Sequence, residues 1–305
     1  MSRLKALLVL ALAAAGMGFG AAPGTAVVSA KSAAPIGIVV NDKLIPTDSA
    51  PYLARDTVMV PLSAVQSIPG LRVSWNNATK QVTVSREGIR YVLRPGSQQA
   101  VSASGTSRLP AAPALKNGRI MVPLRFIAEA GKAHVAWNPH TRTVYVARAG
   151  DELAAKLKSA DLAEARTAAL HMPETTSLRE VYQWNGGENQ SQDYYFPEGR
   201  ADACFIASGG TVRYYRIGDH YRELVWTARM GGTKADRPAL FFLPYTIEDQ
   251  DGVQPQIKGR VAFYHLMLPI MEAGYGFVET NGTAATLGQK DMKLDTFFNI
   301  PEERQ

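Results

Sequence analysis

The side chains able to act as general acids or bases are scattered along this chain without a recognised catalytic spacing. His220, Glu223 and Asp249 are the candidates for a hydrolase site in the second half. No Gly-x-Ser-x-Gly elbow, His-Glu-x-x-His motif, glycine-rich phosphate loop or cysteine–histidine pairing accompanies them. The sequence therefore assigns no catalytic residue. A secreted hydrolase with its site in the C-terminal half remains the alternative to a non-enzymatic protein.

Metal-binding patterns are equally incomplete. Residues 248–252 (EDQDG) begin like a calcium loop but lack the remaining ligands and the closing glutamate, which predicts a solvated acidic loop. Copper needs clustered imidazoles, whereas His134 and His140 are well separated along the chain and no His-x-His occurs. Cys204 is the single cysteine, so thiolate-rich zinc sites are excluded and we expect a small buried apolar side chain there. No metal and no other cofactor is predicted.

The first half of the chain contains an internal repeat. Residues 51–86 align with residues 113–148 without a gap, at a constant offset of 62, and 13 of the 36 aligned positions are identical. The identical residues of the first segment are Pro51, Leu53, Met59, Val60, Pro61, Leu62, Val73, Trp75, Asn76, Thr79, Val82, Val84 and Arg86. Self-similarity at a fixed offset indicates two copies of one structural unit.

Each segment predicts the same succession of a strand, a helix and a hairpin. Residues 57–60, with 119–122 in the second segment, form an apolar strand. Pro61 and Pro123 then suit the first turn of a helix, where a missing N–H costs nothing. Apolar and polar residues alternate after that helix. A tetrad that begins with asparagine, 76–79 in the first segment, predicts the hairpin turn.

The motifs of the two segments resemble those of a known family. They read VNDKLIP, MVPL and WNxxTKxVTV, then IMVPLRFIAEA and WNPHTRTVYV. Over about residues 36–148 the pattern is similar to the copper amine oxidase N-terminal-like stalk domain, present here as two repeats at an offset of 62. This resemblance implies a non-catalytic module of bacterial surface and secreted proteins that is fused to many different C-terminal partners. Residues 63–67 depart from the family's usual R-x-I-x-E.

No copper amine oxidase activity is expected, because no Asn-Tyr-Asp/Glu run exists from which the quinone cofactor could form. Trp75 and Trp137 recur at the same place in the two hairpins, and two interpretations stay open. Each indole can pack on the helix of its own segment, or it can stack on the sugar ring of a ligand. Both are therefore kept as candidate ligand-stacking residues.

The second half predicts a helical linker at 149–172 and a β-rich C-terminal domain of unknown function at 173–305. A single helix is expected from Asp151 to Leu170, because alanine, leucine and lysine dominate that run and Pro173 ends it. Five antiparallel strands separated by glycine-containing turns are expected at 179–184, 193–196, 201–208, 211–217 and 221–230. The whole chain is thus predicted to be α+β, with a duplicated strand–helix–hairpin module followed by a helix and a mostly antiparallel β domain.

The N-terminus predicts export. Residues 1–30 contain Arg3 and Lys5, then a short apolar stretch, then small residues that end at Ala30, as in a secretory signal peptide. We expect cleavage near Ala30, a secreted or cell-surface product and no transmembrane span after removal of the signal. Removing residues 1–30 would lower the formal net charge from +6 to +4, because the segment holds two cations and no acid.

The remaining positive charge suggests anionic partners, such as a cell-wall polymer or glycan. Nucleic acid is not expected, since lysine and arginine are scattered rather than gathered in a run. These observations predict a secreted, non-catalytic cell-envelope or extracellular protein in which the stalk-type module anchors or spaces a β-rich binding domain.

Overall fold

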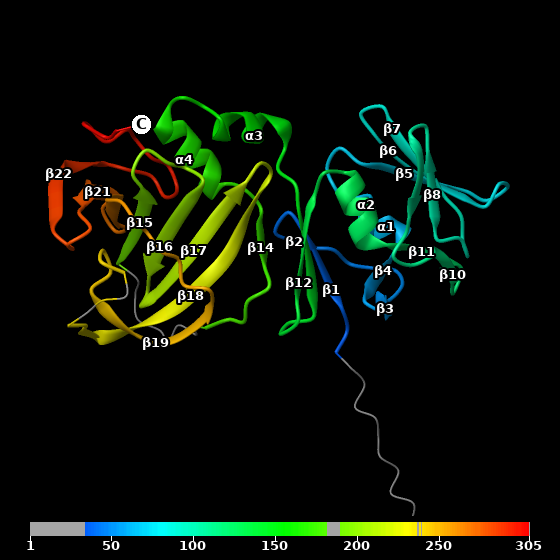
Figure 1. Ribbon diagram of the computed structural model, residues 1–305, viewed down its shortest axis with the longest axis horizontal. Coiled ribbons are helices and arrows are strands. Elements are labelled where there is room, and N and C mark those ends of the chain that lie inside the picture. The colour runs from blue at the N-terminus through cyan, green and yellow to red at the C-terminus, as the bar shows by residue number, and fades with distance from the viewer. Residues whose placement is uncertain (1–33, 182–189, 237, 239, 305) are drawn as a thin grey trace, which may run out of the picture. The chain divides into compact units, whose positions relative to one another are not determined.

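A computed structural model describes residues 34–181, 190–236, 238 and 240–304 (Figure 1). Strands predominate over helices throughout these residues, which confirms the α+β, β-rich class. Pro35–Gln305 form one compact unit. The predicted signal peptide and the second half of the strand expected at 179–184 lie outside the described residues.

The first half of this unit, here called the N-terminal module, contains thirteen strands and two short helices among the described residues. In chain order they are β1 (Gly37–Val40), β2 (Lys43–Leu44), β3 (Tyr52–Ala54), β4 (Thr57–Pro61), α1 (Leu62–Val65), β5 (Arg72–Asn76), β6 (Gln81–Arg86), β7 (Ile89–Leu93), β8 (Gln99–Ser102), β9 (Gly105–Arg108), β10 (Ala114–Lys116), β11 (Arg119–Pro123), α2 (Leu124–Ala130), β12 (His134–Asn138) and β13 (Thr143–Ala147).

Element bounds recur at the same offset as the sequence repeat. Both ends of β3, β4 and β5 align with both ends of β10, β11 and β12, and the start of α1 aligns with the start of α2. Helix α1 of the first segment is shorter than α2 of the second, because Pro69 disfavours helical geometry at Ile68 and Gly70 follows at φ +73°. The second segment has no proline there, so α2 continues to Ala130.

The two segments meet at the strand pair β4–β11. The antiparallel register places Val60 directly opposite Val122, which is its counterpart in the alignment. The four-stranded sheet therefore runs β10-β11-β4-β3, with equivalent strands at equivalent distances from its centre. One layer of the module is in this way shared equally between the two segments.

The hairpins of the module are completed by strands from elsewhere in the chain. Strand β1 pairs in parallel with β13, at the far end of the second segment. Strand β8, the counterpart of β1 at the repeat offset, joins the sheet of the first segment through β7, in the order β5-β6-β7-β8-β9. Each hairpin sheet thus gains a strand from outside its own repeated segment, and both helices pack with these sheets around one apolar core.

The second half, here called the β domain, contains the helices α3 (Asp151–Leu157) and α4 (Leu162–Leu170) and nine strands among the described residues. The strands are β14 (Glu174–Thr176), β15 (Ser191–Pro197), β16 (Ala203–Ser208), β17 (Thr211–Gly218), β18 (Tyr221–Lys234), β19 (Tyr245–Gly252), β20 (Val261–Met267), β21 (Glu272–Val278) and β22 (Ala284–Asp291). They form one sheet in the order β14-β18-β17-β16-β15-β20-β21-β22, with β19 paired to β18, and only the β14–β18 pair is parallel.

Three local expectations are wrong. The helix expected from Asp151 to Leu170 is two helices, because the carboxylate of Asp161 accepts hydrogen bonds from the backbone N–H groups of Ala163 and Glu164 and starts a new one. The acidic stretch 248–252 is part of β19 rather than a loop, since it pairs with β18. Residues 179–181 form no strand, because the backbone N–H of Arg179 binds the side chain of Asp251.

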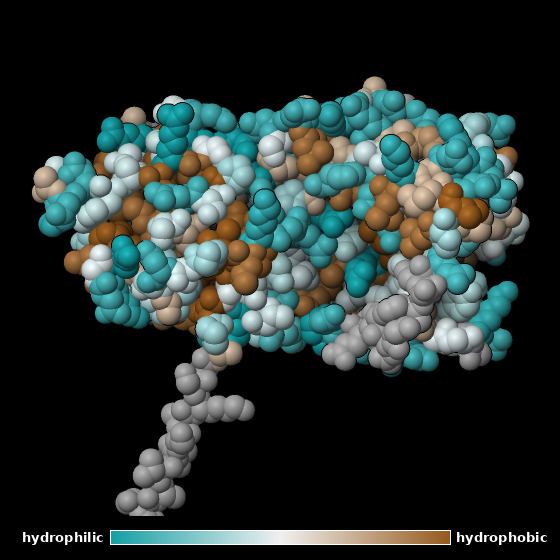
Figure 2. All heavy atoms as spheres, turned by 180° about the vertical axis from the view of Figure 1, so that it is seen from behind, coloured by the Kyte–Doolittle hydropathy of each residue, from teal (hydrophilic) through white to brown (hydrophobic). Residues whose placement is uncertain are grey.

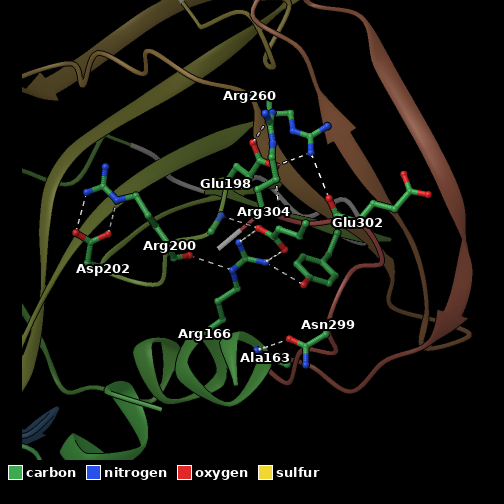
Figure 3. Close-up of polar contacts among 12 residues, drawn as sticks. Ala163, Arg166, Glu198, Arg200, Asp202, Arg260, Asn299, Glu302 and Arg304 are labelled. Carbon is green, nitrogen blue, oxygen red and sulfur yellow. Dashed lines mark hydrogen bonds and ion pairs between the residues drawn. The ribbon is translucent and has the colours of Figure 1, made fainter. Parts of the chain in front are cut away.

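Helix α4 belongs to the core of the β domain. Its apolar side packs against the sheet face that carries Tyr194, Phe196 and Tyr264. Helix α3, which precedes α4 in the chain, lies beside it (Figure 1). Arg166 on α4 is fully buried and binds the carboxylate of Glu303, with 2.8 Å between Nη1 and Oε2 (Figure 3). The ion pair connects the C-terminal segment to helix α4.

A second ion cluster holds the same segment at its other side. The carboxylate of Glu198, just after β15, binds the guanidinium groups of Arg260 and Arg304 (Figure 3). These hydrogen bonds lower the pKa of Glu198 to about 2. Glu198 is therefore ionised, and able to pair with both arginines, at neutral pH.

Candidate functional site

A groove with a volume of about 700 Å³ lies in the N-terminal module, around Trp75. We call it the Trp75 groove. It is formed by the β5–β6 turn, the β4–α1 junction, the β10–β11 hairpin and the chain that leaves β7. The groove therefore draws on both repeated segments, and its shape depends on the tertiary fold of the module.

The local structure around Trp75 follows from the strand alternation of its hairpin. Val73 and Trp75 are half-buried against the core, whereas Ser74 between them is exposed. In the register of β5 and β6, Trp75 stands opposite the buried Val82. Asn76 then makes the turn, since its side-chain oxygen accepts hydrogen bonds from the backbone N–H groups two and three residues on. The indole is thus anchored at its base and lines the groove.

Positive charge gathers at the same groove. Lys80, Arg94 and Arg119 line it, together with one acid, Asp48. Arg119 pairs with Asp48, with 3.0 Å between Nε and Oδ2, and Lys80 donates to the side chain of Asn77 at 2.7 Å. The guanidinium of Arg94 is exposed and, within the described ranges, makes no ion pair or side-chain hydrogen bond. The groove therefore holds a net positive charge with one unpaired arginine.

The rest of the lining is apolar and partly open to water. Leu115 on β10 is 65% exposed although it borders the groove, and Leu62, Pro61 and Pro95 complete this part of the wall. On the face of the molecule drawn in Figure 2, hydrophobic side chains form separate patches among hydrophilic ones rather than one continuous apolar surface. An indole, apolar side chains and cations in one groove suit a ligand with an apolar face and anionic groups.

The equivalent hairpin of the second segment is engaged differently. Asn138 makes the same turn as Asn76, but it is buried and donates from Nδ2 to the carbonyl oxygen of Leu178 in the β domain at 2.7 Å. His134 on the same hairpin stacks on Tyr221, with 3.8 Å between ring centroids and 6° between planes. Burial lowers the pKa of His134. One hairpin thus contacts the β domain, and the other borders the groove.

Comparison with known proteins agrees with this architecture. Residues 39–146 match the family model of the copper amine oxidase N-terminal domain. This confirms the resemblance that the repeated motifs indicated. The match begins within β1 and ends within β13 of the N-terminal module, and it includes both hairpins and the whole Trp75 groove.

One relative is a protein of Brevibacillus choshinensis that is named "Protease inhibitor". It is 33% identical over 114 residues, which are 37% of this chain and 35% of that protein. The chain therefore aligns with about a third of the length of this relative. In the part of the chain that the structure describes, no helix is both long and apolar enough to cross a membrane.

The residues proposed for a hydrolase site do not come together. His220 binds the carbonyl oxygen of Ala149 through Nδ1 at 3.1 Å, at the junction with the N-terminal module. Glu223 pairs with Arg216, and Asp249 pairs with Arg179. Asp249 stands opposite Arg229, well beyond Glu223 on β18, which separates the two acids by roughly 20 Å at ~3.3 Å per residue.

The candidate metal ligands and the cysteine have other roles. His134 lies in the stack with Tyr221, and His140 is exposed at its turn. Among the described residues, no three or more histidine, cysteine, aspartate or glutamate side chains are grouped as metal ligands would be. Cys204 is fully buried, as expected, and burial raises the pKa of its thiol to about 12.

One pair of interacting titratable side chains was missed by sequence reasoning. His265 on β20 stands directly opposite Asp193 on β15, and its Nδ1 is hydrogen bonded to the aspartate. The contact raises the pKa of the imidazole. The residues are far apart in the chain, and no motif marks either of them. Only the pairing of β15 with β20 brings them together.

Proposed function

We propose that this chain is an exported, non-catalytic protein of the cell envelope. In this proposal the N-terminal module is a duplicated stalk-type unit that spaces the β domain, and its Trp75 groove binds an anionic envelope polymer or glycan. The leader-like residues 1–30 support export. The match of residues 39–146 to the copper amine oxidase N-terminal domain supports the module's part.

The observation that carries the proposal is the different use of two equivalent turns. Asn138 and His134 of the second hairpin contact the β domain. Asn76 and Trp75 of the first hairpin border an open groove instead. One hairpin therefore fixes the module to its partner domain, and the equivalent surface of the other is left for a ligand.

The duplication is supported by more than the sequence identities. Four features recur at the offset of the alignment: strand bounds, helix starts, the asparagine turns, and left-handed backbone at Arg55 and Asn117 and at Lys80 and Arg142. The direct opposition of Val60 and Val122 is what two copies related by an approximate two-fold axis would produce. A single ancestral unit that was copied once accounts for all of these features.

Binding at the groove would combine charge with stacking. Each exposed cation contributes little at ~0.15 M salt, because the screening length there is about 8 Å. Lys80, Arg94 and Arg119 must therefore act together, and Trp75 would hold a sugar ring or another apolar face between them. Such a site would prefer a polymer that carries anionic groups at regular intervals to a small isolated anion.

Retention on purified bacterial cell walls tests the proposal. We expect strong retention at low salt that falls steeply by ~0.5 M, because the screening length shortens. Arg94→Gln should weaken retention, whereas Arg90→Gln, which removes an exposed cation outside the groove, should change it little. Trp75→Ala should weaken retention further at equal salt.

Three results would contradict the proposal. Retention that ignores salt would assign binding to another surface. Equal losses in Arg94→Gln and Arg90→Gln would show that net charge, and not the groove, decides binding. Release of soluble products from the wall would overturn the non-catalytic function and favour the hydrolase alternative.

The relative from Brevibacillus choshinensis suggests a second candidate, protease inhibition. Its name states that activity, and its identity of 33% extends over 114 residues. A panel of serine, cysteine and metalloproteases incubated with the purified chain would test this function. Loss of protease activity at near-stoichiometric amounts of intact chain would support it, and progressive digestion of the chain without inhibition would exclude it.

A further inference from the structure

A second hollow of about 700 Å³ lies in the β domain, on the sheet face opposite to α4. Tyr194 on β15 and Tyr264 on β20 belong to the core that includes α4. Because side chains alternate along a strand, their neighbours Asp193, Tyr195 and His265 face the other side. We call this hollow the His265 pocket.

Strand register gives the floor of the pocket. Asp193 stands opposite His265, and Tyr195 stands opposite Phe263, so these four side chains form a compact group on one face. On the next strand, β21, the residue opposite His265 is Gly274. A Cβ atom on Gly274 would meet nothing within 4 Å, and its φ is not in the left-handed region. The absence of a side chain at Gly274 therefore leaves the floor of the pocket open. The backbone conformation at this position does not require a glycine.

Two walls enclose this floor. On one side, the chain between β18 and β19 brings Phe241 and Phe242 over the sheet, with 4.9 Å between the rings of Phe242 and Tyr195. On the other side, the β21–β22 hairpin contributes Gln289, which stands opposite Gly274, while Asn281 at the turn of this hairpin lies next to Gly282 and close to Phe241. The aromatic rings and the Asn281 amide thus lie toward one end of the pocket, and Gln289 and the His265–Asp193 pair lie toward the other.

The charged groups of the pocket are of both signs. Lys234 and Asp236 line it together with the hydrogen-bonded His265 and Asp193. Unlike the Trp75 groove, the pocket therefore has no excess of cationic side chains. A purely apolar ligand would fit poorly, because it would leave the amides and the remaining hydrogen-bonding atoms of the Asp193 carboxylate and the His265 imidazole without partners.

We propose that the His265 pocket binds an uncharged saccharide. The C–H face of a sugar ring would pack on the aromatic side chains, and its hydroxyl groups would bond to Asp193, His265 and Gln289. The site is distinct from the Trp75 groove and does not rest on the function proposed for the module. It gives the β domain a ligand of its own.

The test uses the intact chain and three uncharged tetrasaccharides: chitotetraose, which is built of N-acetylglucosamine, and the glucose tetramers cellotetraose and maltotetraose. Binding is measured by calorimetry and by ligand-observed NMR. At least one tetramer should bind with a dissociation constant below ~10 mM. The affinity should be the same at low salt and at ~0.5 M, because screening acts on charges.

Filling the floor of the pocket gives the decisive variant. Gly274→Val should weaken binding about tenfold or more, which corresponds to about 1.4 kcal/mol, and it should fold normally since valine suits a strand. Gly259→Val is the matched control, because this glycine also has open space at its Cβ position but lies outside the pocket. Gln289→Ala removes one amide at the rim of the pocket without filling its floor, and it should also weaken binding. This variant replaces Gly274→Val in the test if Gly274→Val does not fold.

Each outcome decides the proposal. No response to any tetramer at ~10 mM overturns it. Binding that survives both Gly274→Val and Gln289→Ala places the saccharide elsewhere and also overturns it. Trp75→Ala should leave the affinity for the tetrasaccharide unchanged. The proposal for the His265 pocket and the proposal for the Trp75 groove can therefore fail independently.

Discussion

Arg86, at the end of β6, donates a hydrogen bond from Nη1 to the carbonyl oxygen of Gly131, which ends the helix of the other segment. Arg148, the counterpart of Arg86, lies beside Gly70, with its Nη1 3.7 Å from the place that a Cβ atom on Gly70 would take. Both arginines are buried. Arg86 thus holds the end of the first segment against the helix end of the second, whereas the guanidinium of Arg148 binds Ala149 and Asp151 and lies near Gly70 without a hydrogen bond to it.

The first prediction concerns the left-handed backbone at these helix ends. Gly70 has φ +73° and its counterpart Lys132 has φ +56°. Gly70→Ala should lower the free energy of unfolding by about 1–2 kcal/mol, and Lys132→Gly should raise it by roughly 0.5–1 kcal/mol, because only glycine adopts this region without a steric cost. Urea unfolding measures both. Changes of the same sign would contradict the equivalence of the two sites.

The second prediction concerns the buried pair Arg166–Glu303 (Figure 3). Glu303→Gln should cost about 3–5 kcal/mol of unfolding free energy, because it leaves a buried guanidinium without its anion. The double variant Arg166→Met with Glu303→Leu should recover most of the loss. Asp202→Asn, in the exposed pair with Arg200, is the control and should cost no more than ~1 kcal/mol. Equal costs at the two sites would refute the distinction.

The third prediction is a pH dependence of stability. Arg260 and Arg304 hold the pKa of Glu198 at about 2, below its ordinary value of 4.5. A lowered pKa contributes stability that is complete above the ordinary value and is lost as the pH falls through about 2. Glu198→Gln should therefore cost roughly 1–3 kcal/mol at neutral pH and much less near the bottom of this window. Urea unfolding of both proteins at several pH values measures the loss of unfolding free energy. An equal loss at every pH would disprove the predicted pH dependence.

The fourth prediction has the opposite sign. Asp193 raises the pKa of His265 above the ordinary 6.5. The stabilisation from this pair is complete below the ordinary value and disappears as the pH rises through the folded-state pKa. Titration of the imidazole by NMR should give a value above 6.5, and Asp193→Asn should lower it. An unchanged titration in Asp193→Asn would show that the hydrogen bond does not control the histidine.

The fifth prediction is export with cleavage after Ala30. The cationic end, the apolar stretch and the small residues of the leader are what a signal peptidase substrate requires. The intact mass of the chain recovered from the culture medium or the cell surface should correspond to a start at residue 31. A recovered chain that still carries Arg3 and Lys5 would be inconsistent with cleavage.

Much of the module was predictable because its signals are local. Alternation along β5 and β6, the proline before each helix and the asparagine turn all act within a few residues, so they appear in any reading of the repeat. The burial of Cys204 was predictable for the same reason, since it lies in an apolar strand. The helix break at Asp161 was missed because an N-cap inside an alanine-rich run is a weak signal beside strong helix propensity.

Pairings between distant strands left no trace in the sequence. Strand β1 shows little similarity to β8, yet each extends a hairpin sheet of the module, because register there depends on the assembled core. The His265–Asp193 pair exists only through the β15–β20 ladder.

The two tryptophan hairpins show most directly what sequence and tertiary structure each determined. The sequence by itself determined that Trp75-Asn76 and Trp137-Asn138 form the same strand end and turn, since local hydrogen bonds decide that geometry. It could not distinguish their uses, because identical residues carry identical local information. Only the tertiary structure decided that Asn138 is buried against Leu178 of the β domain while Trp75 borders an open, cationic groove, since that depends on which surfaces the rest of the chain covers.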